Sequence, residues 1–136
     1  MKTSEILQEC EIIFLLGANE IDINKLNLKA FIVYIGHHGD RIAEIADVIL
    51  PATAFTGKNS TYVNLEGTVQ NTQAAITPLG QSKIDWQIIL ELAGLCGIAL
   101  KYSDLLGIRK RMAEINHVFK GVKHFKHSIM PSRALK

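Results

Sequence analysis

The sequence predicts an α/β fold: a parallel sheet with flanking helices, then a β-hairpin and carboxy-terminal helices. Three short apolar runs, at residues 11–16, 30–35 and 47–50, are each followed by a glycine or a proline. Continuous apolar runs of this length are typical of strands that are buried on both faces. The polar segments between the runs allow the chain to cross back over the sheet, so we expect the three strands to lie parallel.

The segments around these strands supply short helices and turns. Residues 4–9 favour a short helix before the first strand, with Glu5 near its positively polarised end. Residues 18–27 are polar and predict a loop, or a loop with one helical turn. A turn at residues 37–40 leads into a short helix at residues 41–45. Pro51 is expected to end the third strand, because proline has no amide hydrogen for the ladder.

The second half of the chain predicts a hairpin and two longer helices. Residues 60–64 and 68–71 flank a Leu-Glu-Gly turn, a spacing that favours a β-hairpin. A helix is expected to begin after Ser82 as N-cap, with Asp85 completing an acidic capping box and Gly97 ending the helix. Its apolar face would contain Ile84, Ile88, Leu92, Leu95 and Cys96.

A last helix is expected from residue 103 to about residue 119, weakened in its first turn by Gly107. Its inward positions would be Leu105, Ile108, Met112, Ile115 and Phe119. Periodicity is lost beyond Gly121. We therefore expect an α/β domain at residues 1–120 and a basic, flexible tail at residues 121–136.

Length and composition are those of one globular domain. The chain has 136 residues, of which 48% are hydrophobic and 21% are charged. No apolar run approaches the ~20 residues that a membrane helix needs, so direct membrane insertion is not expected. The amino terminus lacks the long apolar core of a secretory signal.

Charge is divided unevenly along the chain. Residues 1–100 hold six Lys/Arg against eleven Asp/Glu, a net of −5, whereas residues 101–136 hold nine against two, a net of +7. A basic tail can bind nucleic acid, an anionic membrane surface or an acidic protein, or it can simply be solvated. No recognised nucleic-acid motif accompanies it, and we do not expect a nucleic-acid partner.

The two cysteines do not predict a metal site. Cys10 and Cys96 are far apart in the sequence, and an iron–sulfur cluster ordinarily takes four thiolates. Cys96 falls on an apolar helical stripe and is expected to be a core residue. Free thiols at these positions suit a reducing compartment.

The remaining candidates do not form a catalytic pattern. His37 and His38 are adjacent, so they point to different sides of the backbone and would need outside ligands to bind a metal. Asp40 and Glu44 could carry general acid or base work, but nothing pairs them with a nucleophile. Glu66 is expected to satisfy turn amides or a neighbouring chain. The sequence therefore predicts no catalytic, cofactor-binding or metal residue.

Five segments, taken in order, carry a family resemblance. Residues 34–40 are Tyr-Ile-Gly-His-His-Gly-Asp, 46–51 are Ala-Asp-Val-Ile-Leu-Pro, 61–67 are Thr-Tyr-Val-Asn-x-Glu-Gly, 76–80 are Ile-Thr-Pro-x-Gly and 85–89 are Asp-Trp-x-Ile-Ile. Together they closely resemble the large iron–sulfur subunit of respiratory NADH:quinone oxidoreductase (complex I). The second and third segments are shared with the wider molybdopterin oxidoreductase superfamily, whereas the first and last favour complex I.

The resemblance implies a Rossmann-like, molybdopterin-oxidoreductase-like fold that lacks the molybdenum cofactor. It implies a structural carboxy-terminal segment of the subunit, with no cofactor in this chain, because the parent subunit carries its clusters in an amino-terminal region. The implied partners are the remainder of that subunit and other peripheral-arm subunits. The implied location is the cytoplasmic side of a bacterial inner membrane or the matrix side of the mitochondrial one.

Two positions depart from the family. The family commonly has an acidic residue where this chain has Gly57, before Lys58, and an arginine where it has Thr68, after Gly67. Losing a guanidinium removes a fork of five donors. If the acid and the arginine normally pair, losing both would be less damaging than losing one.

Two other interpretations remain open: a fragment of an active molybdopterin-dependent oxidoreductase, and a stand-alone adaptor whose basic tail engages an acidic partner. For the complex I interpretation, a parallel sheet separated from its partners would expose apolar edges and faces. The isolated chain is then expected to be marginally stable or to self-associate.

Overall fold

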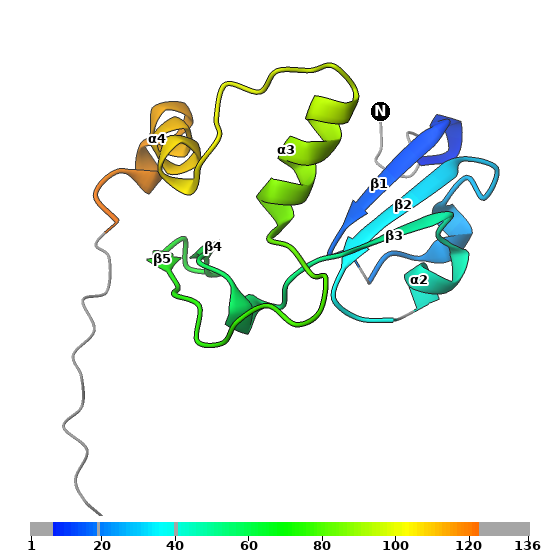
Figure 1. Cartoon of the computed structure of the whole chain (residues 1–136), viewed down its shortest axis with the longest axis horizontal. Coiled ribbons are helices and arrows are strands. Elements are labelled where there is room, and N and C mark those ends of the chain that lie inside the picture. The colour runs from blue at the N-terminus through cyan, green and yellow to red at the C-terminus, as the bar shows by residue number, and fades with distance from the viewer. Residues whose placement is uncertain (1–6, 19, 40, 123–136) are drawn as a thin grey trace, which may run out of the picture.

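A three-stranded parallel sheet forms the first half of the protein. The structure, a computed structural model, describes residues 7–18, 20–39 and 41–122 (Figure 1). Strands β1 (Ile12–Leu16), β2 (Phe31–Gly36) and β3 (Val48–Pro51) pair in the order β1-β2-β3, all parallel. The predicted parallel sheet is confirmed. Each strand begins one residue later than expected.

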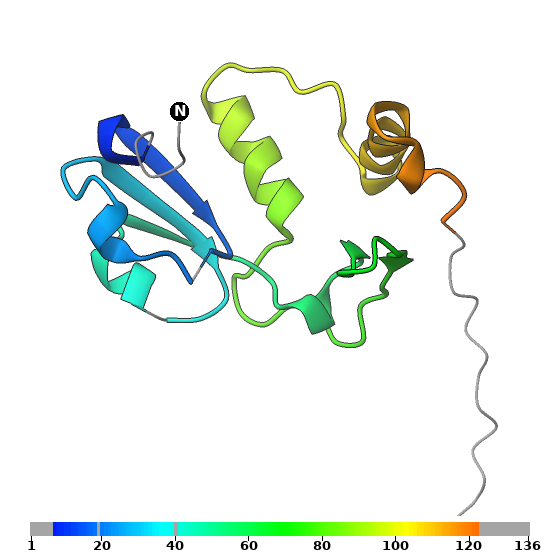
Figure 2. The ribbon, with the colours of Figure 1, turned by 180° about the vertical axis from the view of Figure 1, so that it is seen from behind.

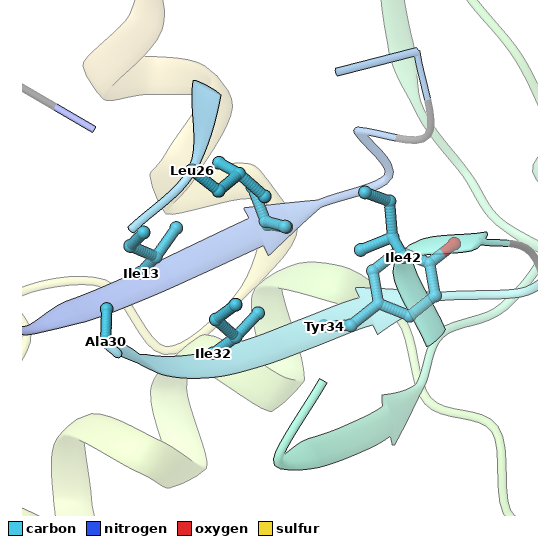
Figure 3. Packing of buried hydrophobic residues seen from close by; sticks show 7 residues of the cluster. Ile13, Leu26, Ala30, Ile32, Tyr34 and Ile42 are labelled. Atoms are coloured by element: carbon cyan, nitrogen blue, oxygen red, sulfur yellow. The ribbon is translucent and has the colours of Figure 1, made fainter. Parts of the chain in front are cut away.

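Both crossovers lie on one face of the sheet. The first contains the 3₁₀ turn η1 (Ile23–Lys25), and the second contains helix α2 (Arg41–Ile45). Leu26 from the first crossover and Ile42 from α2 pack against alternate residues of β1 and β2 (Figure 3). The buried members of this cluster are Ile13, Leu15, Leu26, Ala30, Ile32, Tyr34 and Ile42. A right-handed connection from each strand to the next places both crossovers on the same side.

Helix α3 (Asp85–Leu95) covers the middle of the opposite face. Ile88 is buried against Val33 and Ile35 of β2, and Leu92 packs beside it. Figure 2 shows α3 on the side of the sheet away from α2. The three layers are therefore a thin crossover layer, the sheet, and one helix.

The predicted hairpin is confirmed. After the 3₁₀ turn η2 (Phe55–Gly57), strands β4 (Thr61–Val63) and β5 (Val69–Asn71) pair antiparallel. Gly67 has a φ of 80°, a left-handed conformation that suits glycine. The turn amides of residues 66 and 68 donate to the Asn64 side-chain oxygen at 3.1 and 2.8 Å. Asn64, and not Glu66, therefore satisfies the turn amides.

The start of α3 differs from the prediction. Its N-cap is Ile84, which makes no side-chain cap, and the Ser82 hydroxyl instead donates to the Leu79 carbonyl at 2.8 Å. Residues 79–82 thus form their own turn, and the capping box does not form. Gly97 does adopt the predicted left-handed conformation, with a φ of 73°. Cys96 is exposed and not in the core, because the last turn of α3 extends beyond Leu92, its last residue packed against the sheet.

The last helix is shorter than predicted. Helix α4 (Leu105–Ile115) begins after Asp104, whose carboxylate accepts from the Gly107 amide at 2.6 Å, and the chain continues into the turn η3 (His117–Phe119). Ile115 is exposed and not inward.

At the amino end, residues 7–9 are helical, while residues 4–6 of that predicted helix lie outside the described residues, as does most of the predicted tail, residues 123–136. Within the described ranges, no helix combines the length and apolarity needed to cross a bilayer.

Candidate functional site

A pocket of about 370 Å³ lies at the carboxyl ends of β2 and β3. Its walls come from the turn after β2, the segment after β3, and the loop at residues 76–79 that returns from the hairpin. The carboxyl ends of parallel strands are where open α/β sheets bind their ligands. The pocket therefore lies where a sheet of this kind would hold a ligand.

Two histidines form the polar rim of the pocket. The rings of His37 and His38 lie with centroids 4.1 Å apart and tilted by 44°. Partial desolvation of its ring, the neighbouring His38 and the Lys58 ammonium lower the pKa of His37 below its usual 6.5, and Asp85 opposes them. A lowered pKa favours the neutral imidazole, which can donate one hydrogen bond and accept another.

Thr53 lines the inner wall of the pocket. The residue is 2% exposed, and its hydroxyl has no hydrogen-bond partner among the described residues. The backbone N–H of Thr53 donates to the Lys83 carbonyl at 2.8 Å, which ties the segment after β3 to the loop before α3. The sequence carried no signal for this residue, because its burial depends on chain segments 30 residues away.

An ion pair joins the pocket region to α3. The Lys58 ammonium lies 2.5 Å from an Asp85 carboxylate oxygen, and the two side chains are 14% and 30% exposed. Asp85 is the first residue of α3, where a negative charge also complements the helix dipole. The pair connects Asp85, in the last of the resemblance segments, to a lysine 27 residues away that lies outside those segments, a contact that local sequence does not predict.

The predicted candidates are not brought together. Glu44 is exposed on α2, Glu66 is exposed at the hairpin tip, and Cys10 is half-buried against the β1–β2 core. Asp40 lies outside the described residues. Among the residues that the structure describes, no three His, Cys, Asp or Glu side chains gather as a metal site would require.

The two departures from the family lie in different surroundings. Gly57 is buried, and a Cβ added there would lie 2.6 Å from the Thr53 side-chain methyl. Thr68 is exposed in the hairpin turn. The atoms nearest to a Cβ at position 57 belong to Thr53 and Ile76, and not to Thr68. Packing against Thr53 is therefore one local reason for a glycine at position 57.

The pocket lining does not match a phosphate-bearing pterin. Such a cofactor calls for guanidinium or ammonium groups, and no Lys or Arg is among the described lining residues. The Lys58 ammonium, which is close enough to influence His37, is already paired with Asp85. The exposed surface of the lining is mainly apolar, contributed by residues such as Ile49, Ile76 and Leu79.

A second contact attaches α4 to the hairpin. Arg109 donates from Nε to the Thr61 hydroxyl at 3.2 Å and from Nη2 to the Ser60 carbonyl at 3.3 Å. An arginine that bridges a side chain and a backbone carbonyl fixes the helix against β4. This contact holds the fold and offers no reactive group.

Known proteins match most of this chain. It is 48% identical over 107 residues to the NADH-ubiquinone oxidoreductase 78 kDa subunit of Candida albicans, 45% identical over 115 residues to that of Neurospora crassa, and 46% identical over 116 residues to an NADH-quinone oxidoreductase subunit of Rickettsia felis. These alignments cover 79–85% of this chain but only 15–17% of the relatives. The molybdopterin oxidoreductase profile matches residues 1–95. The chain belongs to the molybdopterin oxidoreductase family, and within it matches one segment of the large subunit of NADH:quinone oxidoreductase.

Proposed function

We propose that this chain is the structural carboxy-terminal segment of the large iron–sulfur subunit of NADH:quinone oxidoreductase. In that role it supports the peripheral arm, which passes electrons from NADH to quinone. The observation that carries the proposal is the 45–48% identity to subunits of such oxidoreductases over about four-fifths of this chain. Because the chain spans 15–17% of those subunits, the electron-transfer activity would belong to the larger assembly.

The chemistry of the chain supports an architectural role. Its two cysteines are too few for a four-thiolate cluster, so clusters would be held in an amino-terminal part of the parent subunit. What the structure supplies instead is a set of contacts between distant segments, such as Lys58–Asp85 and Arg109–Thr61. These contacts fix distant segments of the chain relative to one another, which is what an architectural role requires.

The partners would be the rest of the large subunit and the neighbouring subunits of the peripheral arm. The chain would then lie on the cytoplasmic face of a bacterial inner membrane, or on the matrix face of the mitochondrial inner membrane.

The test is to place an affinity tag at the carboxy terminus in the native host and to purify the protein gently. The eluate is assayed for NADH:quinone oxidoreductase activity and for iron–sulfur clusters. We expect both to co-purify with the tagged chain and neither to co-purify with an equally tagged unrelated protein. Recovery of the chain without activity or clusters contradicts the proposal.

The family match favours a second candidate, a fragment of an active molybdopterin enzyme. Molybdenum and pterin in the same eluate, at about one per chain, would support that candidate over the first. The third candidate, an adaptor with a basic carboxy-terminal region, predicts that the recovered partner is released by raised salt, because screened charges bind weakly.

A further inference from the structure

The described residues cover one face of the sheet only in part. β1 alternates buried and exposed residues, and its exposed set lies on the same face as Phe31 of β2, which pairs with Ile12. The exposed fractions are 57% for Ile12, 58% for Phe14, 49% for Leu16 and 49% for Phe31. We call these four residues the open face. Contiguous exposed apolar residues of this size mark an interaction surface.

Helix α3 covers the neighbouring part of the same face and stops short of β1. Its Ile88 and Leu92 pack over Val33, Ile35 and Leu50, which belong to β2 and β3. Phe14 pairs in register with Val33, and Leu16 with Ile35, so the open face begins where the footprint of α3 ends. A second element lying beside α3 would complete this layer.

β1 has the composition of an interior strand, although it lies at one edge of the sheet. Its five residues are all apolar, and none carries the charge or proline that protects a natural edge. β3 lies at the other edge and ends in Pro51, which has no amide hydrogen to offer a further strand. A further parallel strand is therefore expected beside β1, and not beside β3.

The winding of the chain indicates what covers the open face. From β1 to β3 the strands advance in one direction, and both crossovers lie on the face opposite the open one. In a doubly wound sheet, strands on the other side of the first strand advance in the opposite direction, so their right-handed crossovers lie on the other face. A helix from such a half would lie directly over Ile12, Phe14 and Leu16.

Two sources could supply this element. A second copy of the chain, related by a two-fold axis, would pair β1 with β1 antiparallel and would not extend the parallel sheet. The large relatives offer the other source, since more than four-fifths of their length lies outside the segment that this chain matches.

We propose that the open face is the docking site for an amphipathic helix from the remainder of the large subunit, which also adds a parallel strand to the edge of β1. The helix would present apolar residues at i, i+3, i+4 and i+7 to the open face and lie alongside α3. This inference rests on the proposed function, whether the remainder is on the same polypeptide or on a separate one.

The test places the photo-cross-linker p-benzoylphenylalanine at position 14 in the native host. The control carries the same group at position 65, an exposed leucine in the hairpin turn. The tagged NADH:quinone oxidoreductase is purified and irradiated, and the linked peptides are identified by mass spectrometry. We expect position 14 to link to one helical segment of the large subunit outside the matched region, at residues spaced three or four apart. Position 65 should not reach that segment.

A substitution gives an independent readout. Phe14→Glu should lower recovery of the chain with the oxidoreductase by about tenfold or more, because it buries a charge at the centre of an interface. Leu65→Glu, which adds the same charge on the hairpin, should leave recovery unchanged. Circular dichroism of both isolated variants checks that the fold is kept. If Phe14→Glu does not fold, the cross-linking experiment at position 14 tests the proposal by itself.

The outcomes separate the inference from the proposed function. If the chain does not co-purify with the oxidoreductase, the proposed function fails and the inference with it. The inference alone is overturned in two cases in which the chain still co-purifies. In one, position 14 cross-links to a second copy of this chain. In the other, position 14 gives no more cross-links to the large subunit than position 65 does.

Discussion

The side-chain carboxylate of Asp47 accepts a hydrogen bond from the backbone N–H of Ile32 at 2.7 Å, while the backbone N–H of Asp47 donates to the Ile32 carbonyl at 2.9 Å. One residue thus satisfies both backbone groups of Ile32, near the start of the central strand. β3 begins at the next residue, so this contact sets the register between β2 and β3. It gives a physical reason for aspartate in the Ala-Asp-Val-Ile-Leu-Pro segment.

Removing this acceptor should destabilise the sheet. Asp47→Ala leaves the Ile32 amide without its charged partner, and we expect a loss of about 1–3 kcal/mol in the free energy of unfolding. Asp47→Asn keeps an acceptor oxygen and should lose less. Urea unfolding followed by circular dichroism measures both values. Equal losses for the two variants would show that the hydrogen bond to Ile32 is not the cause.

Position 57 should tolerate a side chain only when Thr53 is made smaller. A Cβ at position 57 would lie 2.6 Å from the Thr53 methyl, so Gly57→Ala should destabilise the protein by about 1–3 kcal/mol. In a Thr53→Ala background, Gly57→Ala should lower the free energy of unfolding by clearly less, because the methyl group that it would clash with is absent. A double-mutant cycle on unfolding free energies gives the coupling. Additive costs would contradict the packing explanation for Gly57.

The Lys58–Asp85 pair should contribute more to the free energy of unfolding than an exposed ion pair does. Both side chains are largely shielded, so Lys58→Met leaves a shielded carboxylate unpaired and should cost about 1–3 kcal/mol. The double variant with Asp85→Asn should recover part of that loss. Lys83 and Glu91 form a matched exposed pair, for which Lys83→Met should cost less than about 1 kcal/mol. Similar losses for Lys58→Met and Lys83→Met would contradict this ranking.

His37 should titrate below its usual pKa, and Lys58 should be one cause. NMR titration of the ring is expected to give a midpoint under 6.5, which rises in Lys58→Met and falls further in Asp85→Asn. A lowered folded-state pKa means that the unfolded chain binds the proton more readily. The contribution of His37 to stability is therefore present above the unfolded pKa and is lost as the pH falls through the folded one.

The same group predicts a pH dependence of unfolding. Between about pH 7 and pH 5, His37→Gln should lose less stability on acidification than the unchanged protein, because one proton-linked group has been removed. Denaturant unfolding at a series of pH values measures this. Parallel curves for the two proteins would contradict a lowered pKa at His37.

Local patterns were enough to predict most of the secondary structure. The three strands and their parallel order follow from apolar runs that end at a glycine or proline, and the hairpin follows from a glycine turn at residues 65–67. These signals are strong because every residue that produces them lies within or next to the element itself. The resemblance segments likewise indicated the family that the comparisons show.

Two of the predictions for α3 were wrong. The sequence predicts Ser82 as the N-cap of α3, but Ile84 occupies the N-cap position, and the Ser82 hydroxyl lies outside the helix and donates to the Leu79 carbonyl. Cys96 has the helical spacing of a core residue, yet α3 extends past the part of the sheet that it covers. Periodicity identifies a face of a helix but not how much of that face meets another surface.

Which segments become strands, turns and helices follows from the sequence alone, because backbone preference and apolar spacing act over a few neighbouring residues. Local patterns did not predict that Thr53 is buried, that Lys58 pairs with Asp85, or that Phe14 is left exposed while Val33 beside it is buried. Each of these depends on where α3 and the returning loop lie on the sheet. That placement is settled by burial of distant surfaces against one another, and no local pattern encodes it.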